Sequence, residues 1–316
     1  MKNPAFSLVQ YHAGSGAQLV GILSDETIFA LPAHLGERTM MSLIEDWTLV
    51  EDLLYELNTD SLKSVSGAKI LAPLTFPHKV LCVGANYYSH AEEMKTKRPD
   101  PTAEPFFFFK PPTVTIIGHG APVAMPAVEG ANLDWEAELA VVISRSVRNI
   151  TAEEAHSAIA GYCIANDLSA RGQFARPDAV FPAFAYDWIG HKGQDGFCPL
   201  GPGIVPHWQV EDPMSVQMTL EVNGELKQDA NTSDMVVDIY HQIAAASRLM
   251  TLEPGDVILT GTPAGVGMPR GTFLKSGDSM TVRIEGIGEL TTTVVDSLEP
   301  VSSSGAAGHS EVGAGR

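Results

Sequence analysis

The chain has 316 residues, of which 44% are hydrophobic and 18% are charged, as in an ordinary soluble globular protein. Its formal net charge is −18 and no basic stripe is present, which argues against a nucleic-acid-binding protein because phosphate contacts need clustered Lys and Arg. An anionic substrate would need a local positive charge, which a bound cation could supply.

Three cysteines, Cys82, Cys163 and Cys198, lie far apart in apolar surroundings. They show no Cys/His spacing typical of zinc and suit a reducing compartment. The first residues lack the long apolar core of a signal peptide. No run of roughly eighteen apolar residues would span a bilayer. We therefore expect a cytoplasmic protein without a membrane segment.

Residues 1–75 are expected to form a small N-terminal α/β domain. Short apolar runs alternate with Gly and Ser over residues 6–31, which is typical of two or three strands joined by turns. Apolar side chains recur at helical spacing over residues 40–57. Two prolines in residues 71–80 then indicate a linker into the next element.

Residues 76–300 are predicted to form a larger, strand-rich domain. Strands are expected at residues 79–84 and 162–167, and a hairpin over residues 279–295. The polar, glycine-rich residues 301–316 are predicted to be a disordered tail.

Few helices interrupt these strands. One is expected over residues 151–161, where Thr151 and Glu154 form a capping box and Gly161 ends the helix. A second, amphipathic helix is expected over residues 233–250. This order lacks the regular alternation of a doubly wound fold and favours an α+β fold of mixed or antiparallel sheet.

Two carboxylates, Glu136 and Glu138, stand two positions apart in the apolar stretch LDWEAELAVVI. Because β-branched residues follow, we predict a strand, on which both carboxylates face one side about 7 Å apart. Carboxylates this close repel each other unless one is protonated or a divalent cation such as Mg²⁺ or Ca²⁺ binds both. The alternative is a polar strand face exposed to solvent.

Two further motifs carry groups that could do chemistry. Asp167 follows the predicted strand 162–167 and could be a third metal ligand, or else a helix N-cap or Asx turn. His90 and Glu93 share one face of a short helix expected after Gly84. Such a pair could activate water as a general base, or it could be an ordinary surface pair.

Lys192 and Thr262 lie beside glycine-rich turns. Lys192 could hold a carboxylate or an oxyanion, although an isolated lysine indicates nothing by itself. Thr262 lies in the loop of residues 259–267, whose backbone N–H groups could bind an anion. The loop matches neither the P-loop nor the dinucleotide-binding pattern.

Seven stretches between residues 78 and 295 resemble the fumarylacetoacetate hydrolase family, in the family's order. They are CVGANYYSHAEEM, FFFKPPTVTIIG, LDWEAELAVVI, GYCIANDLSAR, KGQDGFCPLGP, VNGELKQDANTSDMV and LEPGDVILTGTPAGVG. No single stretch is decisive, but their shared order argues against coincidence. The resemblance implies a strand-rich α+β catalytic roll of mixed β-sheet, usually a homodimer, preceded by the small N-terminal domain.

The resemblance also implies a metal site and a catalytic pair. Glu136, Glu138 and Asp167 would bind Mg²⁺ or Mn²⁺, with Ca²⁺ as a further option. His90 and Glu93 would form the water-activating dyad, on a short helix that often closes as a lid.

The remaining implied roles concern the substrate. Lys192 would assist catalysis, and Thr262 would bind the oxo-acid part. Arg171, Gln173 and Tyr87 would be further substrate-binding residues. The family often has Asp after this arginine and Gln two positions further on. Here glycine follows and the glutamine comes one place early, so the entrance of the site is expected to differ.

The implied site suits the chemistry of a 2-oxo acid, because a cation bound to such an acid stabilises the enolate that C–C cleavage leaves. We expect a metal-dependent hydrolase of a 2,4-dioxo acid, such as fumarylpyruvate or another acylpyruvate. The alternative is an isomerase, decarboxylase or hydratase of a 2-oxo or 2-hydroxydienoic acid in aromatic catabolism. A third hypothesis, a non-catalytic protein that kept the fold, would not explain why like charges stay together. Residues 172–190 and 88–104 are expected to select the small-molecule substrate.

Overall fold

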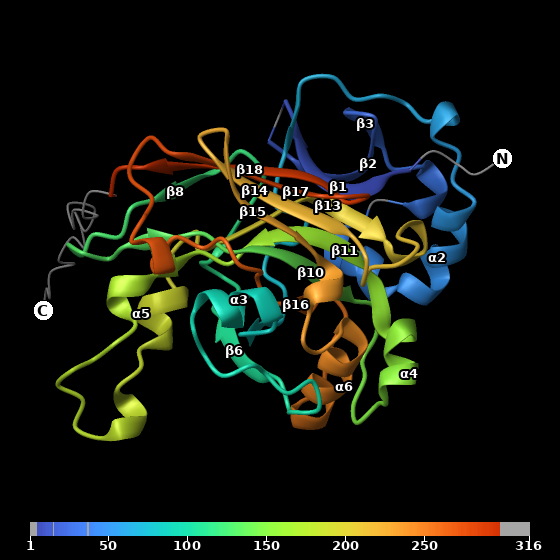
Figure 1. The fold of residues 1–316 in the computed structure, drawn as a ribbon. Helices are drawn as coiled ribbons and strands as arrows, with labels where there is room; N and C mark the ends of the chain where they lie inside the picture. Colours follow the sequence, from blue (N-terminus) through green and yellow to red (C-terminus); the bar gives the residue numbers. More distant parts are fainter. Residues whose placement is uncertain (1–4, 15, 37, 298–316) are drawn as a thin grey trace, which may run out of the picture.

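The computed structural model describes residues 5–14, 16–36 and 38–297, and it shows a large β-sheet at the centre of the molecule (Figure 1). The strands of this sheet are β1 (Ser7–Ala13), β2 (Gln18–Ser24), β3 (Thr27–Ala30), β4 (Ala68–Ile70), β5 (Val80–Gly84), β6 (Phe106–Lys110), β7 (Ile116–Ile117), β10 (Ala137–Ile143), β11 (Ile159–Asn166), β13 (Cys198–Pro206) and β16 (Val257–Leu259). Their order is β3-β2-β1-β13-β11-β10-β16-β5-β6, with β4 beside β1 and β7 beside β13.

A smaller sheet packs against the large one. Its strands, in spatial order, are β15 (Glu225–Asn231), β14 (Gln217–Val222), β17 (Ser279–Ile284), β18 (Gly288–Val295) and β8 (Pro122–Ala124). β14, β17 and β18 contact β10 and β11, so the two sheets form layers. A short ladder joins β9 (Leu133–Asp134) to β12 (Ser169–Ala170). The predicted hairpin over residues 279–295 is confirmed.

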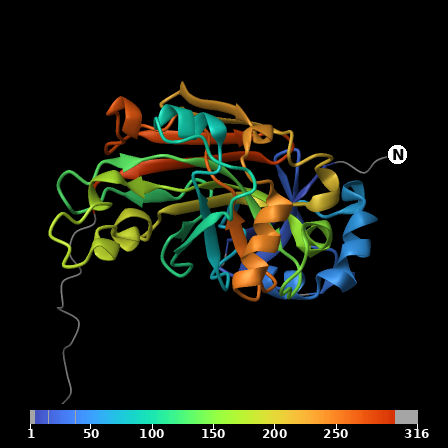
Figure 2. The same ribbon diagram turned by 60° about the horizontal axis from the view of Figure 1, so that its bottom comes forward.

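Helices are few and short, as the sequence predicts. They are α1 (Met40–Glu45), α2 (Trp47–Tyr55), α3 (Tyr88–Glu93), α4 (Ala152–Ala155), α5 (Trp188–Lys192) and α6 (Ile239–Leu249). The predicted α+β fold of mixed sheet is confirmed. Figure 2 shows α2 and the N-terminal strands at one end of the molecule and the segment around α5 at the other.

The N-terminal segment extends the large sheet instead of forming a sheet of its own. β1 pairs with β13 through Leu8 and Ile204. Leu8 and Trp47 belong to the same buried cluster as Cys82 and Ala140. Strands and core therefore cross residue 75, and the division into two domains there stays a prediction. The predicted tail, residues 301–316, lies outside the described residues.

β10 is buried on both faces because alternate side chains enter two different cores. Leu139 and Val141 pack in the cluster between the two sheets, whereas Ala140 and Val142 pack in the cluster on the other face of the large sheet. This double burial explains the nearly continuous apolar run. Any polar side chain on β10 must therefore find its partners inside the protein.

Two predicted helix boundaries are wrong. α6 begins at Ile239 instead of residue 233, because the Asp238 side chain accepts a hydrogen bond from the His241 N–H (2.9 Å) and caps the helix there. The capping box at Thr151 is present, but α4 is short, and Gly161 lies inside β11 instead of ending a helix.

Gly161 is needed for close strand packing. A Cβ added there would lie 2.2 Å from the Val205 carbonyl oxygen on β13 and 2.9 Å from Ile204 Cγ2. We expect Gly161→Ala to lower the free energy of unfolding by about 1–3 kcal/mol, the usual cost of overpacking. Urea denaturation measures this, and an unchanged midpoint would show that the strands separate freely at this point.

Among the described residues, no helix is long and apolar enough to cross a membrane.

Candidate active site

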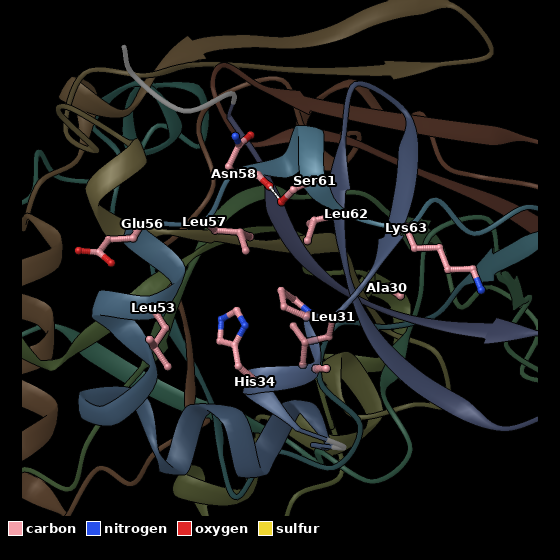
Figure 3. A pocket seen from close by; sticks show the side chains of 12 residues that line it. Ala30, Leu31, His34, Leu53, Glu56, Leu57, Asn58, Ser61, Leu62 and Lys63 are labelled. Atoms are coloured by element: carbon pink, nitrogen blue, oxygen red, sulfur yellow. Dashed lines mark hydrogen bonds between the residues drawn. The ribbon is translucent and has the colours of Figure 1, made fainter.

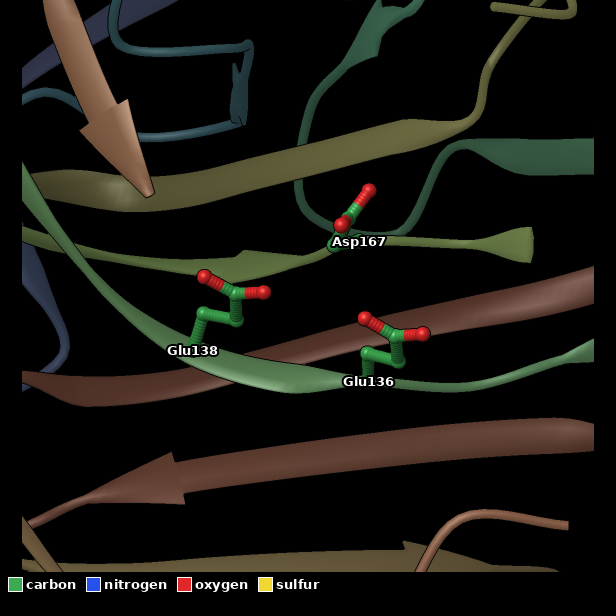
Figure 4. A group of neighbouring side chains, drawn as sticks. All are labelled: Glu136, Glu138 and Asp167. Carbon is green, nitrogen blue, oxygen red and sulfur yellow. The ribbon is translucent and has the colours of Figure 1, made fainter. Parts of the chain in front are cut away.

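Three carboxylates from two neighbouring strands converge within the large sheet (Figure 4). Glu136 and Glu138 flank Ala137, the first residue of β10, and project to the same side, as predicted. Asp167 directly follows β11, and its N–H donates to the Glu136 carbonyl (2.8 Å). One oxygen of each carboxylate lies within 4.8 Å of the others. Glu136 is 7% exposed and Glu138 1%, which excludes a solvent-exposed strand face.

Lys192 and Arg171 are two of the cationic side chains that hold this carboxylate group in place. Lys192 Nζ donates to Glu136 Oε2 (2.9 Å) and to Asp167 Oδ2 (2.6 Å). Arg171 donates through Nε to Asp134 Oδ2 (2.9 Å) and through Nη2 to Glu136 Oε1 (2.6 Å). Arg171 was predicted as a substrate-binding residue; in the structure it orients a carboxylate of the candidate metal site.

Of Glu136 and Glu138, Glu138 is the carboxyl whose ionised form is disfavoured by its surroundings. Burial, followed by Asp167 and Glu136, raises the pKa of the Glu138 carboxyl well above its usual range. Burial also disfavours the ionised form of Glu136, but Lys192 and Arg171 outweigh it and hold the pKa of that carboxyl well below its usual range. Burial opposes the charge of Lys192 as well, but Asp167 and Glu136 raise the pKa of Lys192, so it stays protonated.

The carboxylate group fits a divalent metal ion. Among the described residues, no ion pair reaches Glu138, whose Oε2 accepts the Gly261 N–H (2.6 Å). Its raised pKa marks a buried negative charge without a cation of its own. A hard divalent cation prefers such oxygen ligands and would favour the ionised form. Glu136, Glu138 and Asp167 can therefore hold a divalent metal, whose identity the geometry does not specify.

Lys110 is a residue of this site that the sequence analysis missed. It is completely buried at the end of β6. Its Nζ pairs with Asp167 Oδ1 (2.7 Å) and donates to the carbonyls of Leu168 (3.0 Å), Lys192 (2.8 Å) and Phe197 (2.7 Å). Lys110 thus fastens the loop that carries Asp167 to the helix that carries Lys192. The available signal was a lone charge ending a strand of four phenylalanines.

We expect Lys110→Met to lower the free energy of unfolding by about 3–5 kcal/mol, because it removes the donor to three buried carbonyls and one of the two lysines that pair with the buried Asp167. Lys63→Met, at an exposed lysine, is the matched control. Chemical denaturation of both variants measures the difference. Equal midpoints would show that Lys110 has no structural role.

His90 and Glu93 lie on α3 but are not hydrogen-bonded to each other. His90 Nδ1 is 3.9 Å from Glu93 Oε2. Glu93 instead accepts the Gly265 N–H (2.9 Å) and pairs with Arg270 (2.9 Å), which ties α3 to the glycine-rich loop. Burial lowers the pKa of His90, so its ring is neutral, as a general base requires. The water-activating dyad stays a prediction.

A cavity of about 220 Å³ opens beside the carboxylate group. Residues from α3, α5 and the glycine-rich loop line it together with those of the strands. The predicted site residues in its lining are His90, Glu136, Asp167, Arg171, Lys192 and Thr262. Residues far apart in the sequence therefore meet at one site that can take a small molecule.

Thr262 lines the cavity, but its hydroxyl donates to the Ala137 carbonyl (2.9 Å) and accepts from Gln228 Nε2 (2.9 Å), so its one proton is already used. Tyr87 is completely buried and does not line the cavity. Gln173 is also absent from the lining, where its neighbour Phe174 is present. Substrate binding by these residues stays a prediction.

A larger hollow of about 680 Å³ lies in the N-terminal segment, between the end of β3 and α2 (Figure 3). Its lining includes Leu53, Leu57 and the exposed His34. Ser61 Oγ donates to the Asn58 carbonyl (2.8 Å) within it. Within the described ranges, the one cluster of candidate metal ligands lies beside the smaller cavity. The volume of a hollow therefore does not identify the candidate active site.

A comparison with known protein families identifies the family of the chain. The profile described as "Fumarylacetoacetate (FAA) hydrolase C-terminal" matches residues 79–295. The chain belongs to the fumarylacetoacetate hydrolase family. The resemblance read from seven sequence stretches is confirmed.

Curated relatives in this family carry different names. Rv2993c of Mycobacterium tuberculosis is 42% identical over 236 residues, which cover 75% of this chain and 82% of the relative. The Xenopus laevis protein named oxaloacetate tautomerase fahd2, mitochondrial, is 40% identical over 234 residues, covering 73% of this chain and 70% of the relative. The family therefore includes proteins named for a reaction other than hydrolysis.

Solved structures of the family share the whole fold. A fumarylacetoacetate hydrolase from Exiguobacterium antarcticum has a TM-score of 0.77 at 33% identity, covering 92% of this chain and 100% of its own. A maleylpyruvate hydrolase from Sphingobium sp. SYK-6, solved with manganese(II) and pyruvate, has a TM-score of 0.75 at 30% identity, with coverage of 92% and 100%. A 2-hydroxyhepta-2,4-diene-1,7-dioate isomerase from Mycobacterium marinum has a TM-score of 0.70 at 32% identity, with coverage of 93% and 100%.

Within this fumarylacetoacetate hydrolase scaffold, sequence reasoning also missed Asp134 and Ser169. Asp134 is fully buried and accepts hydrogen bonds from the N–H groups of Gly267 (2.7 Å) and Met268 (3.1 Å) besides Arg171. Ser169 Oγ donates to Glu136 Oε1 (3.0 Å). Ser169 therefore holds Glu136 directly and Asp134 holds it through Arg171, the positions that outer partners of metal ligands usually occupy. An Asp two residues before Glu136, on the predicted strand, was the available signal for Asp134.

Proposed function

We propose that this protein is a divalent-metal-dependent hydrolase that cleaves a C–C bond in a 2,4-dioxo acid of the acylpyruvate type. The observation that carries the proposal is the meeting of three groups at one cavity. A neutral His90 and a protonated Lys192 line the same cavity as Glu136 and Asp167, two of the three carboxylates that can hold a metal. Mg²⁺ and Mn²⁺ are the proposed ions, supported by the manganese(II) in the structure of a maleylpyruvate hydrolase.

Each residue has a distinct task in this reaction. Glu136, Glu138 and Asp167 would hold the metal, and a bound divalent ion would supply Lewis-acid chemistry at the site. Lys192 Nζ donates toward the enolate charge left by C–C cleavage. His90 takes a proton from water as the water attacks the 4-carbonyl carbon. The bond between C3 and C4 then breaks and leaves its electron pair on the C3 side. C3 takes up the proton that His90 removed from water, so the products are pyruvate and the carboxylic acid of the acyl group.

Glu93 has a positioning task in this scheme. Its hydrogen bond to Gly265 and its ion pair with Arg270 hold α3 against the glycine-rich loop. This contact keeps His90 over the cavity. In a complex with substrate, the 3.9 Å separation of the two side chains could shorten to a hydrogen bond, because catalytic contacts often tighten on binding.

Isomerisation or tautomerisation of a 2-oxo acid is the second candidate. The relative named oxaloacetate tautomerase, at 40% identity, favours it. The same residues would serve, since a neutral His90 can move a proton between carbon and oxygen without adding water. Decarboxylation and hydration are related outcomes of the same enolate chemistry.

Product analysis separates these reactions. Metal-loaded protein would be supplied with acetylpyruvate or with oxaloacetate, while pyruvate, acetate, CO₂ and the enol absorbance are followed. Equimolar pyruvate and acetate from acetylpyruvate is the expected result. Loss of the oxaloacetate enol without pyruvate would establish tautomerisation instead, and CO₂ release would establish decarboxylation. No turnover together with no divalent-ion binding would leave the non-catalytic hypothesis.

The assembly and the location are part of the same proposal. We propose a homodimer in the cytoplasm, with a small oxo acid as the substrate and neither nucleic acid nor membrane as a partner. Gel filtration with light scattering tests the homodimer, and cell fractionation tests the location, which is open since one relative is named as mitochondrial.

A further inference from the structure

Four ring side chains form one wall of the cavity beyond the metal-site carboxylates. This aromatic wall consists of Phe108, Phe174, Trp188 and His191. The ring of Trp188 stacks on Phe108 (4.8 Å between centroids, 25° between planes) and on His191 (6.0 Å, 3°). Phe174 meets Trp188 edge-on (5.3 Å, 78°). The rings support one another, so the wall is a preformed apolar surface.

His191 contributes a ring but no charge. Neither of its ring nitrogens has a hydrogen-bond partner among the described residues. Burial, followed by the positive charges of Lys192 and Arg171, lowers the pKa of His191 to about 2. The imidazole therefore stays neutral, and its buried ring nitrogens offer an anion no positive charge.

The two cationic side chains in the lining, Lys192 and Arg171, are already paired with carboxylates. Lys192 is bound to Glu136 and Asp167, and Arg171 is bound to Glu136 and Asp134. The pyruvyl end of a substrate, near the metal-site carboxylates, can share Lys192. An anion at the far end of the substrate would find no positive charge of its own in the lining.

The next basic residue along the glycine-rich loop does not change this conclusion. Arg270 follows Met268, which lines the cavity, but Arg270 pairs with Glu93 (2.9 Å). Placing an unpaired carboxylate against an apolar wall is costly, because the charge loses water without gaining a partner. The cavity, at about 220 Å³, is also smaller than the roughly 300–1,000 Å³ of most ligand sites, so the substrate must be small.

We propose that this enzyme prefers acylpyruvates whose acyl end is uncharged and flat, with aroylpyruvates as the best fit, over those that end in a second carboxylate. This preference rests on the proposed hydrolytic function and adds the class of its acyl group. The proposed substrates have one carboxylate, whereas the compounds named for the maleylpyruvate hydrolase and for the dienedioate isomerase have two.

A panel of acylpyruvates tests the preference on the metal-loaded wild-type protein. The substrates are acetylpyruvate, benzoylpyruvate, fumarylpyruvate and the methyl ester of the fumaryl carboxylate, which keeps the shape and removes the charge. We expect kcat/KM to be at least about tenfold higher for benzoylpyruvate, and also for the ester, than for fumarylpyruvate. Fumarylpyruvate cleaved as well as benzoylpyruvate or its own ester would overturn the proposal.

Acetylpyruvate separates failure of this inference from failure of the proposed function. It has neither a ring nor a second charge, so any acylpyruvate hydrolase with this site should cleave it. If acetylpyruvate and all other acylpyruvates stay intact, both the hydrolytic function and the acyl preference fail. If acetylpyruvate is cleaved but fumarylpyruvate is the best substrate, the hydrolytic function stands and the acyl preference alone fails.

Two substitutions then test the wall itself. Trp188→Ala should lower the ratio of benzoylpyruvate to acetylpyruvate kcat/KM by about fivefold or more, through lost ring contacts. Ile189→Ala, at the next position on α5, where the side chain is 62% exposed and outside the lining, should keep the wild-type ratio. An unchanged ratio in Trp188→Ala would contradict a role for the wall in selecting the acyl group.

A charge added to the lining should reverse the selection. Met268 is 43% exposed, so a lysine stem can be accommodated there. Met268→Lys is expected to raise kcat/KM for fumarylpyruvate relative to its ester by about tenfold, whereas the neutral Met268→Gln leaves that ratio unchanged. Equal ratios in the two variants would show that charge in the lining does not determine the preference.

Discussion

Glu138→Gln is expected to abolish both divalent-metal binding and turnover. The substitution keeps the acceptor for the Gly261 N–H but removes one of three carboxylate ligands. Loss of even an outer partner of a metal ligand typically costs about 10–100-fold in affinity, so loss of a ligand should weaken Mn²⁺ binding by more than about 100-fold. Isothermal titration of EDTA-stripped protein with Mn²⁺ measures this directly.

The same variant should fold normally, and this separates a metal defect from a folding defect. In metal-free protein, Glu138 is the carboxyl whose pKa burial and the neighbouring charges raise, so a neutral amide relieves repulsion. We expect the melting temperature of metal-free Glu138→Gln to equal or exceed that of the metal-free wild type. Glu285→Gln, at an exposed turn, is the control and should bind Mn²⁺ like the wild type. Normal Mn²⁺ affinity in Glu138→Gln would remove this residue from the metal site.

His90→Ala should stop hydrolysis and leave metal binding intact. His90 lines the cavity but is not one of the clustered metal ligands. A positioned general base typically contributes about 100- to 10,000-fold to the rate, so kcat for acetylpyruvate should fall within that range. Mn²⁺ titration should give the wild-type affinity. His241→Ala, with an exposed imidazole, is the matched control. Full activity in His90→Ala would show that another group activates the water.

The pH dependence of the wild type gives a second test of the same base. Burial lowers the pKa of His90, and the base must be neutral to accept a proton. The rate should therefore hold its plateau as the pH falls through about 6.5, the ordinary histidine value, and decline only at lower pH. A decline centred at or above that value would argue against a buried histidine as the base.

The orientation of the carboxylate pair could be predicted because its pattern is local. Two carboxylates at positions i and i+2 of a strand must face the same side, whatever the rest of the fold does. The shared side of Glu136 and Glu138 therefore followed from periodicity, whereas the position of Asp167 left a metal ligand and a cap or turn residue as alternatives. The family resemblance then connected these residues to His90 and Lys192, which no spacing in the sequence could bring together.

Residues whose role depends on tertiary packing were missed. Lys110 works through three carbonyls from distant segments and through Asp167, and nothing in a run of phenylalanines indicates those contacts. Gly161 was taken for a helix stop because glycine often ends helices, but its real constraint is the Val205 carbonyl on the adjacent strand. The roles of such a glycine and of a buried charge depend on spatial neighbours that lie far away in the sequence.

The N-terminal segment illustrates the same limit on a larger scale. Its strands and helices were predicted in place, and β1, β2, α1 and α2 lie where periodicity indicated. Its attachment was not predicted, because pairing between β1 and β13 joins residues about two hundred positions apart through backbone hydrogen bonds that leave no sequence pattern.

The most direct test of the account is the metal dependence of pyruvate release. Protein stripped with EDTA would be titrated with Mn²⁺ while pyruvate formation from acetylpyruvate is recorded. We predict no release from the stripped protein, and a rate that rises until a single ion is bound per chain, because the described residues hold one cluster of candidate ligands. Pyruvate release from the stripped protein at the rate of the metal-loaded protein would contradict the account.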